Sequence, residues 1–307
     1  MKMKFYFPAI VIIFFVLITT TSTYAQRMKY HRISAEITPE KLEILFNNGL
    51  EVDHFGFENK KNFTSELSDD DLLLLKKNNI KFKYLVEDLE KNLEKFNKEV
   101  DKNAPKIGSK NAKVAVTTPT NFALGTYGGY FTFAQLQTIL DQMRTLYPNL
   151  ISAKSSIGTS IEGRPVFMIK ISDNPDVDEA EPEMFFNAVH HAREPMSMSQ
   201  LIFFMWHILE NYNTDKDIKT LVNSTELYIV PCVNPDGYVY NQGTNPSGGG
   251  MWRKNRRNNG NGTFGVDPNR NYAFQWGINN TGSSPTSSSD TYRGTAPFSE
   301  PETQIIR

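Results

Sequence analysis

The stretch of sequence that decides the fold reads Glu181-Pro-Glu-Met-Phe-Phe-Asn-Ala-Val-His-His-Ala-Arg-Glu-Pro195. The apolar residues between positions 184 and 189 have the pattern of a strand, and Pro195 suits the first position of a helix. His191 and Glu194 lie between these two elements. The sequence therefore predicts an imidazole and a carboxylate, three residues apart, on the rigid rim of a sheet.

A pair of this kind can bind one metal ion. Zinc accepts histidine nitrogen and glutamate oxygen, and hydrolytic zinc sites keep one position open for water. The spacing alone is weak support, because His207 and Glu210 share it inside the apolar run 201–209, which predicts a buried helix with a core or boundary histidine. Taken alone, His191 and Glu194 also fit an ordinary polar turn.

Three later segments favour the metal site. They are Asn234-Pro-Asp-Gly237, which predicts a turn after the strand 227–233, then Met251-Trp-Arg-Lys-Asn-Arg256, and finally Gly265-Val-Asp-Pro-Asn-Arg-Asn-Tyr272. Separately, the second is typical of a solvated basic loop and the third of a turn. Their order and spacing behind the His-x-x-Glu pair favour a shared site.

In this ordered set of motifs the sequence resembles the zinc metallocarboxypeptidases of the carboxypeptidase A type, peptidase family M14. Tyr127-Gly-Gly-Tyr130 and Ile157-Gly-Thr-Ser-Ile-Glu-Gly-Arg164 are similar to opening segments of that family. The resemblance extends from about Phe122 to the last residue, and more loosely over the segment before it. It implies an enzyme that uses Zn²⁺ to hydrolyse C-terminal peptide bonds of peptides or proteins with a free C-terminus.

The resemblance implies a role for each polar residue of the site. His191 and Glu194 correspond to zinc ligands, and Asp267 to the carboxylate that fixes the tautomer of the ligand histidine. Arg253 corresponds to the arginine that stabilises the developing oxyanion. The remaining matches are to substrate-binding residues: Asn269 and Arg270 to the pair that binds the terminal carboxylate, and Arg193 to an arginine along the substrate channel.

The family also uses a second zinc histidine, a carboxylate-binding tyrosine and a general-base glutamate, and no matching motif occurs in the 307 residues. The other histidines, His31, His54, His190 and His207, do not fit the second ligand. The last segment predicts a helix with Ser299 as its cap and Glu302 in a capping box, which stops after about two turns. We therefore expect this chain to be an inactive N-terminal fragment that lacks the C-terminal third of the catalytic domain.

The N-terminus predicts export. Lysines within residues 1–4, an apolar stretch over residues 5–18 and Thr23-Tyr-Ala25 are typical of a secretory signal peptide, residues 1–25, cleaved after Ala25. The apolar stretch is short for a membrane span and no later segment suits one, so we expect a secreted or periplasmic protein. The single cysteine, Cys232, excludes an intramolecular disulfide and fits a small core residue, and the net charge of −1 argues against a nucleic-acid partner.

Residues 30–96 predict a small α+β domain. Strand patterns at 31–37, 50–57, 62–67 and 80–86 alternate with helices that begin after Thr38 and Ser68, in the order βαββαβ of a ferredoxin-like unit, and a further helix spans 87–98. In the family named above such a domain is a propeptide that shields the active-site cleft, and an unrelated small module is the alternative. The lysine-rich polar segment 97–121 predicts a linker, where we expect an activating protease to cut.

Residues 122–307 predict an α/β catalytic domain with a mixed sheet. Thr132 and Gln135 form a capping box for a helix that ends at Tyr147, and a second helix runs from Pro195 to about Tyr212. Strand patterns lie at 151–157, 165–171, 184–189 and 227–233, and this alternation with helices is typical of a buried mixed sheet. The polar stretches 241–263 and 275–290 predict surface loops.

Two other functions remain open from the sequence. A non-catalytic relative could keep Asn269 and Arg270 to bind the C-terminus of a peptide. A cell-wall peptide hydrolase could use the same scaffold. The non-catalytic relative would lack the family's tyrosine and general base, whereas an enzyme would have them. Substrate profiling would distinguish the cell-wall peptide hydrolase from a carboxypeptidase.

Overall fold

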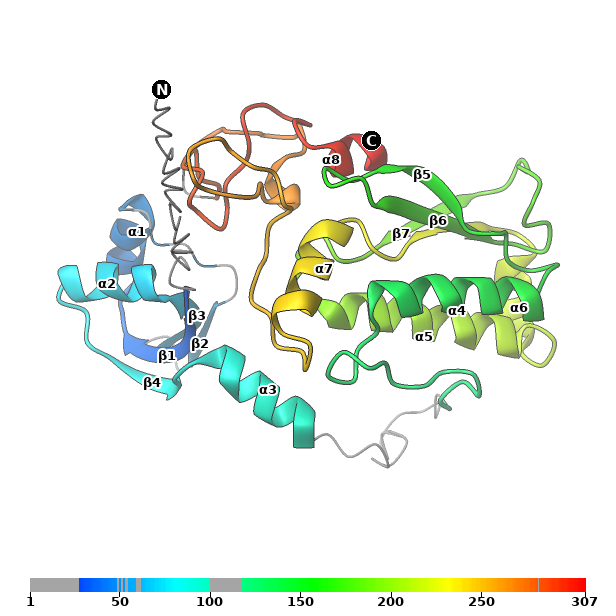
Figure 1. Ribbon diagram of the computed structural model, residues 1–307, viewed down its shortest axis with the longest axis horizontal. Helices are drawn as coiled ribbons and strands as arrows, with labels where there is room; N and C mark the ends of the chain where they lie inside the picture. The colour runs from blue at the N-terminus through cyan, green and yellow to red at the C-terminus, as the bar shows by residue number, and fades with distance from the viewer. Residues whose placement is uncertain are drawn as a thin grey trace, which may run out of the picture.

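The structure of the protein is a computed structural model that describes residues 28–48, 50, 52, 55–58, 62–99, 117–280 and 282–307. The predicted signal peptide, residues 100–116 of the predicted linker and His54 lie outside the described residues. Within them the chain forms two sheets, each with an apolar core of its own (Figure 1). None of the helices in the described part of the chain has the length and apolar content needed to cross a bilayer.

The N-terminal sheet has the strand order β2-β3-β1-β4, and every neighbouring pair is antiparallel. The side chains of Thr38 and Ser68 accept hydrogen bonds from the amides of Lys41 and Asp71, and so cap the two helices between the strands as predicted. The elements are β1 (Tyr30–Glu36), α1 (Pro39–Asn47), β2 (Phe55–Glu58), β3 (Asn62–Ser68), α2 (Asp69–Lys77), β4 (Phe82–Val86) and α3 (Leu89–Glu99). The predicted order βαββαβ is therefore present, with a second strand shorter than the predicted 50–57.

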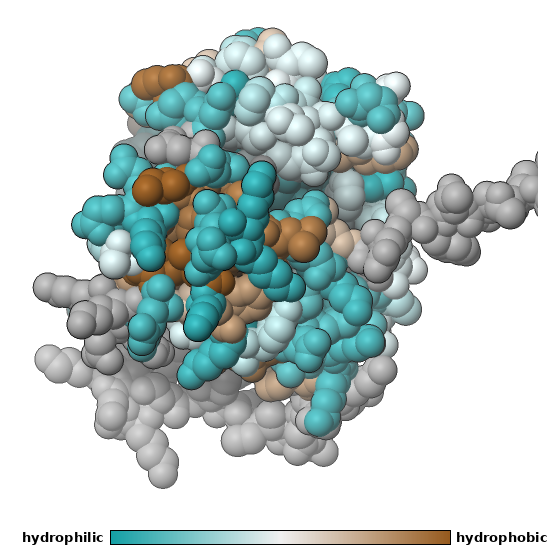
Figure 2. Space-filling view, turned by 90° about the vertical axis from the view of Figure 1, so that its left-hand side faces the viewer, coloured by the Kyte–Doolittle hydropathy of each residue, from teal (hydrophilic) through white to brown (hydrophobic). Residues whose placement is uncertain are grey.

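Helices α1 and α2 bury the apolar side of this sheet. Ile33 and Phe63 of the strands and Leu45 of α1 are 1% exposed or less and pack in one cluster. The side of this unit on which α1 and α2 lie is mostly hydrophilic, with hydrophobic residues between the hydrophilic ones (Figure 2). The N-terminal unit thus has a core that is separate from that of the rest of the chain.

The second sheet is mixed, as predicted. Its order is β5-β6-β8-β7, and β7 is parallel to β8 whereas the other neighbours are antiparallel. Helices α4 and α5 lie along one face of the sheet (Figure 1) and enclose the main core, in which Ile169, Ile229 and Trp206 are fully or almost fully buried. The elements are α4 (Phe133–Leu146), β5 (Ser155–Thr159), β6 (Pro165–Ile171), β7 (Glu183–Asn187), α5 (Pro195–Asn211), α6 (Lys216–Val222), β8 (Glu226–Val230), α7 (Pro235–Thr244), the 3₁₀-helix η1 (Pro268–Arg270) and α8 (Pro301–Ile306).

Several boundaries within this unit differ from the prediction, since β7 ends at Asn187 and β8 at Val230, before the predicted ends at 189 and 233. The pattern at 151–157 predicted a strand, but Ile151 makes only an isolated bridge with Ile171, and β5 begins at Ser155. The segment Asn234 to Gly237 is the first turn of α7, because the Asn234 side chain accepts a hydrogen bond from the amide of Gly237. The predicted loop 241–263 therefore begins only after α7 ends at position 244.

The last helix also begins differently. The predicted cap, Ser299, lies outside α8, whose N-cap is Glu300, and the hydroxyl of Ser299 donates to that carboxylate at 2.7 Å. Glu302 is fully buried and accepts hydrogen bonds from the amide of Ile161 at 3.1 Å and the side chain of Asn255 at 3.0 Å. The predicted capping box is wrong because long-range partners bind both side chains, and for Ser299 this partner is the side-chain amide of Asn271 at 2.8 Å.

Cys232 follows β8 and is 2% exposed within the main core, as predicted. Burial and the nearby Asp236 raise the pKa of its thiol well above the ordinary value. We expect the native protein to resist a thiol reagent at neutral pH and to react at its single cysteine once unfolded, because the thiolate is the reactive form. Absorbance of the released chromophore in native and denaturing buffer measures this, and rapid labelling of the native protein would contradict it.

Candidate metal centre

The candidate site lies at the edge of the second sheet where the parallel neighbours β7 and β8 both end. Strand β7 leads into the segment 188–194, and β8 leads to Asn234 at the start of α7. Parallel strands end on the same side of a sheet, so the segments that follow them meet there. The amides of Val233 and Asn234 donate to the carbonyls of Ala188 and Val189. These bonds anchor the segment 188–194, the ligand loop, to the sheet.

His191, Glu194 and Asp267 are in contact. The Nδ1 atom of His191 lies 2.9 Å from Oε1 of Glu194, and its Nε2 atom lies 3.2 Å from Oδ1 of Asp267. His191 is 7% exposed and Asp267 is fully buried. A carboxylate behind one ring nitrogen fixes the tautomer and leaves the other nitrogen for a metal. These atoms therefore fit a divalent cation such as zinc, held by Nδ1 of His191 and the carboxylate of Glu194.

The charges around His191 favour a cation at this place. Burial by itself lowers the pKa of His191, but the carboxylates of Asp267 and Glu194 outweigh it and raise that pKa to about 9. The free site thus holds a proton that a metal ion can replace. Burial lowers the pKa of the neighbouring His190 to about 4, and its Nε2 atom lies 2.7 Å from the hydroxyl of Tyr272, so this imidazole faces elsewhere.

Arg253 belongs to the same network. Its Nε and Nη2 atoms donate to Oδ2 of Asp267 at 3.0 and 2.8 Å, and both side chains are fully buried. Burial raises the pKa of Asp267, but Arg253 and His191 hold it well below the usual range. The alternative of a solvated basic loop is wrong, since Arg253 and Lys254 are only 1% and 3% exposed.

Asn269 and Arg270 lie on η1, directly after Asp267. The amide of Asn269 donates to Oδ1 of Asp267 at 2.9 Å, and the Asn269 side chain is exposed. The guanidinium of Arg270 donates to the carbonyls of Gly282 at 2.7 Å and Asn269 at 3.1 Å, and its charge helps to lower the pKa of Asp267. The structure therefore places both residues beside the network and bonds Arg270 to its own loop.

Two residues that the sequence did not single out hold Arg193. Its Nη1 atom donates to Oδ2 of Asp290 at 3.0 Å, and its guanidinium lies 5.1 Å from the ring centre of Tyr30, whose hydroxyl donates to the same carboxylate. Tyr30 begins β1, so the N-terminal unit contacts the predicted substrate channel. Tyr30, Arg193 and Glu194 line a cavity of about 140 Å³. No local pattern identifies Asp290, which lies in a serine-rich loop 260 positions from Tyr30.

The second His-x-x-Glu pair has other partners. The ring of His207 stacks on Phe203, and its Nδ1 atom lies 3.4 Å from the side-chain amide of Asn211 within α5. The carboxylate of Glu210 accepts hydrogen bonds from the amides of residues 120 and 121 at 2.6 and 2.8 Å. His207 is therefore a boundary histidine of the helix, as its context predicts.

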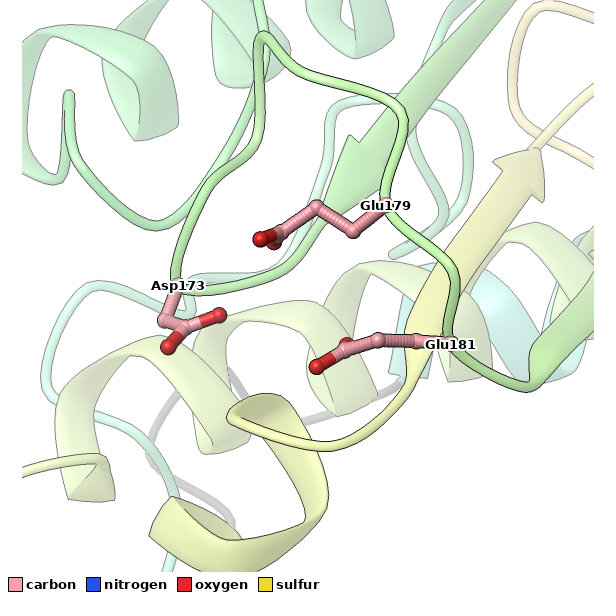
Figure 3. A group of neighbouring side chains, drawn as sticks. All are labelled: Asp173, Glu179 and Glu181. Atoms are coloured by element: carbon pink, nitrogen blue, oxygen red, sulfur yellow. The ribbon is translucent and has the colours of Figure 1, made fainter.

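Groups of three possible ligands occur elsewhere in the described residues, and none of them includes His191. One brings together Asp173, Glu179 and Glu181 in the loop between β6 and β7, with their carboxylates directed toward one another (Figure 3). Oxygen ligands alone suit hard cations such as calcium, not zinc. These carboxylate groups therefore fit a different class of cation from the one that His191 and Glu194 fit.

Comparison with known proteins gives the family. The zinc carboxypeptidase model, Peptidase M14, matches residues 136–307. A zinc carboxypeptidase of Saccharothrix mutabilis subsp. capreolus is 44% identical over 151 residues, which cover 49% of this chain and 34% of that protein. Carboxypeptidase A2 of Rattus norvegicus is 36% identical over 181 residues, which cover 59% of this chain and 41% of that protein. The chain thus spans less than half the length of these curated relatives.

Solved structures agree with the sequence matches. Carboxypeptidase A from Helicoverpa armigera superimposes with a TM-score of 0.68 at 26% identity, covering 91% of this chain and 65% of that chain. The mixed sheet, the His-x-x-Glu pair at its edge and the family match together define a metallopeptidase domain. Because the family model covers more than half of its residues, the chain belongs to the zinc carboxypeptidase family, Peptidase M14. This confirms the resemblance found in the motifs.

Proposed function

We propose that the protein removes residues from the free C-terminus of peptides by zinc-dependent hydrolysis. The observation that carries the proposal is the 2.9 Å approach of His191 Nδ1 to Glu194 Oε1, with Asp267 behind the other ring nitrogen. Zinc bound there supplies a Lewis acid for the scissile carbonyl and acidifies a bound water. Membership of the family supports the same chemistry.

The residues around the metal pair have separate tasks in this proposal. Asp267 fixes the tautomer of His191 and holds Arg253, whose fixed cation stabilises a developing oxyanion more than the ground state. Asn269 and Arg270 bind the terminal carboxylate, because a planar guanidinium can bind it through two hydrogen bonds. Arg270 must then exchange its bond to the Gly282 carbonyl for the substrate.

The catalytic set implied by the family is larger than the set in this chain. The second zinc histidine, the tyrosine and the general-base glutamate have no matching motif among the 307 residues. We therefore propose that catalysis takes place in a longer polypeptide that supplies them. The 307-residue chain by itself should bind zinc weakly and show no turnover.

The N-terminal unit is proposed to be a propeptide of a secreted zymogen. Tyr30 contacts Arg193 and Asp290, and the side-chain amide of Asn245 donates to Glu90 of α3, so the unit covers the candidate channel. Thrombin activatable fibrinolysis inhibitor, which is named for its activation by thrombin, superimposes over 91% of this chain with a TM-score of 0.64 at 26% identity. This alignment supports the same arrangement here.

Removal of zinc tests the catalytic proposal. A chelator is expected to abolish peptidase activity of the longer, activated protein, and added zinc is expected to restore it, because the metal supplies both the Lewis acid and the acidified water. Release of the C-terminal residue from a blocked dipeptide measures the activity. The matched control is the same dipeptide with an amidated C-terminus, which lacks the carboxylate for Arg270 and should not be cleaved. Activity that survives the loss of zinc contradicts the proposal.

Limited proteolysis tests the zymogen proposal. In the longer protein, a trypsin-like protease is expected to cut first within residues 97–121, where the sequence is polar and rich in lysine, and peptidase activity should rise as the cut appears. Mass spectrometry of the fragments and a parallel activity assay give the two time courses. A first cut elsewhere, or full activity before any cut, would show that the N-terminal unit does not block the site.

A further inference from the structure

We propose that Asn234, the first residue of the Asn-Pro-Asp-Gly segment, is a positioning residue. It holds a strained backbone ahead of His191 and so directs the Nδ1 atom of that histidine at Glu194. The inference rests on the proposed metal site. It gives a task to a motif that the catalytic roles above do not use.

The strain lies at Val189. Its φ angle is +56°, in the left-handed region, where a β-branched residue is a genuine outlier. The side chain is 2% exposed and packs in the main core. Such a conformation persists only where the surrounding structure over-determines it, and it is found most often at functional sites. Val189 precedes His190 and His191, so its backbone sets the direction of both imidazoles.

Asn234 supplies bonds that hold this conformation. Its backbone amide donates to the carbonyl of Val189 at 3.0 Å, and its side-chain Nδ2 atom donates to the carbonyl of His190 at 3.1 Å. Asn234 is fully buried, so water does not readily replace either bond. One residue thus fixes two consecutive carbonyl groups immediately before the metal ligand.

Ser197 connects the same turn to the second ligand. Its hydroxyl accepts a hydrogen bond from the amide of Val189 at 3.2 Å and donates to the carbonyl of Glu194 at 2.8 Å. The strained residue is therefore tied to Asn234 on one side and to the first turn of α5 on the other. The Ser197 hydroxyl thus ties the backbone before His191 to the carbonyl of Glu194.

The two adjacent histidines have different partners. His190 reaches the hydroxyl of Tyr272 at 2.7 Å, while His191 reaches Asp267 and Glu194. Successive side chains of an extended chain point to opposite faces, so two adjacent imidazoles diverge in any case, and the backbone at position 189 decides which of them faces Glu194. The strained backbone thus selects which imidazole enters the network.

Gly237 allows the close approach that this arrangement needs. A Cβ atom at this position would lie 2.4 Å from the carbonyl oxygen of Lys254 and 2.8 Å from the Cβ atom of Ala192, the residue after His191. The first turn of α7 therefore packs directly on the ligand loop. This contact brings the side chain of Asn234 within reach of the His190 carbonyl.

Asn234 has two separable tasks. Its Oδ1 atom accepts a hydrogen bond from the amide of Gly237 at 3.0 Å and caps α7, whereas Nδ2 is the donor to His190. Asn234→Asp keeps a good helix cap and removes the donor, and Asn234→Ser does the same with a shorter side chain. A capping role alone predicts little effect of either substitution, but a positioning role predicts a loss of metal affinity.

The experiment measures zinc affinity of the 307-residue chain by competition with a chromophoric chelator, with a thermal melt of each metal-free variant. Asn234→Asp and Asn234→Ser are expected to weaken zinc binding by about 10- to 100-fold, the range found for groups that orient a metal ligand. Their metal-free melts should still show a cooperative transition. Wild-type affinity in both variants would overturn the inference.

Val189→Gly provides the sharper test. Glycine adopts positive φ without strain, so the loop no longer needs to be held by Asn234. In the Asn234→Asp background, Val189→Gly is expected to restore zinc affinity to within about threefold of wild type, although loss of a buried side chain lowers the melting temperature. A merely structural role predicts that the double variant binds zinc more weakly than Asn234→Asp, and that result would refute positioning.

Comparing the wild-type chain with His191→Ala tests the proposed metal site separately from the positioning role of Asn234. If wild type binds zinc and His191→Ala does not, the proposed metal site stands, and the Asn234 variants then decide the positioning role alone. If wild type and His191→Ala bind zinc equally, the metal site itself is wrong and the positioning role is wrong with it.

Discussion

Replacing His191 with alanine is expected to lower the zinc affinity of the chain by at least about 100-fold, since even groups behind a ligand contribute about 10- to 100-fold. The described site offers zinc the Nδ1 atom of His191 and the carboxylate of Glu194, 2.9 Å apart. Removing one of two ligands leaves a single carboxylate, which cannot hold zinc against water. Glu194→Gln should have a similar effect, because the amide is neutral.

The chain carries a matched control for this experiment. His207 and Glu210 have the same spacing, but His207 stacks on Phe203 and Glu210 accepts two backbone hydrogen bonds. His207→Ala should therefore leave zinc affinity unchanged. Competition titration of the three variants against wild type gives the comparison. Equal losses from His191→Ala and His207→Ala would show that zinc binding is not specific to the loop between β7 and α5.

Local signals account for most of the elements that were predicted. Thr132 forms a capping box with Gln135, and Pro195 begins α5, because a few neighbouring residues decide how a helix starts. Asn234 shows where such signals become ambiguous. Asparagine followed by proline is suited both to a turn and to a helix cap, and the packing of α7 on the ligand loop selects the cap.

The sequence predicted which residues form the site, but not the backbone conformation and contacts that arrange them. The order of the motifs brought together His191, Glu194, Asp267 and Arg253, and the structure places them in one network. The positive φ of Val189 has no signature in the sequence, since valine is an unfavourable residue there. Contacts between units, such as the one between β1 and the loop at 290, depend on packing that no local pattern records.

Arg253 and Asp267 form a buried ion pair, and breaking it is expected to destabilise the fold. Arg253→Met is expected to lower the free energy of unfolding of the metal-free chain by about 3–5 kcal/mol, because it removes the main cation from a fully buried carboxylate. Both side chains are fully buried, and Asp267 accepts two hydrogen bonds from the guanidinium. Urea denaturation in the presence of a chelator measures the loss. The exposed pair Arg32 and Glu66, 2.6 Å apart, is the control: Arg32→Met should cost less than about 1 kcal/mol.

The pH dependence distinguishes a lost charge partner from lost packing. In the wild type the pKa of Asp267 is held below its unfolded value, so its contribution to stability is present above that unfolded value and is lost as the pH falls. In Arg253→Met the main cation is gone and burial raises the pKa of Asp267, so protonation at acidic pH relieves the buried charge. The gap in unfolding free energy between the two proteins should therefore narrow as the pH falls from neutral to acidic values.

The double variant Arg253→Met/Asp267→Asn should likewise be more stable than Arg253→Met at neutral pH. A gap that is constant with pH, together with no recovery in the double variant, would assign the loss to packing of the arginine side chain.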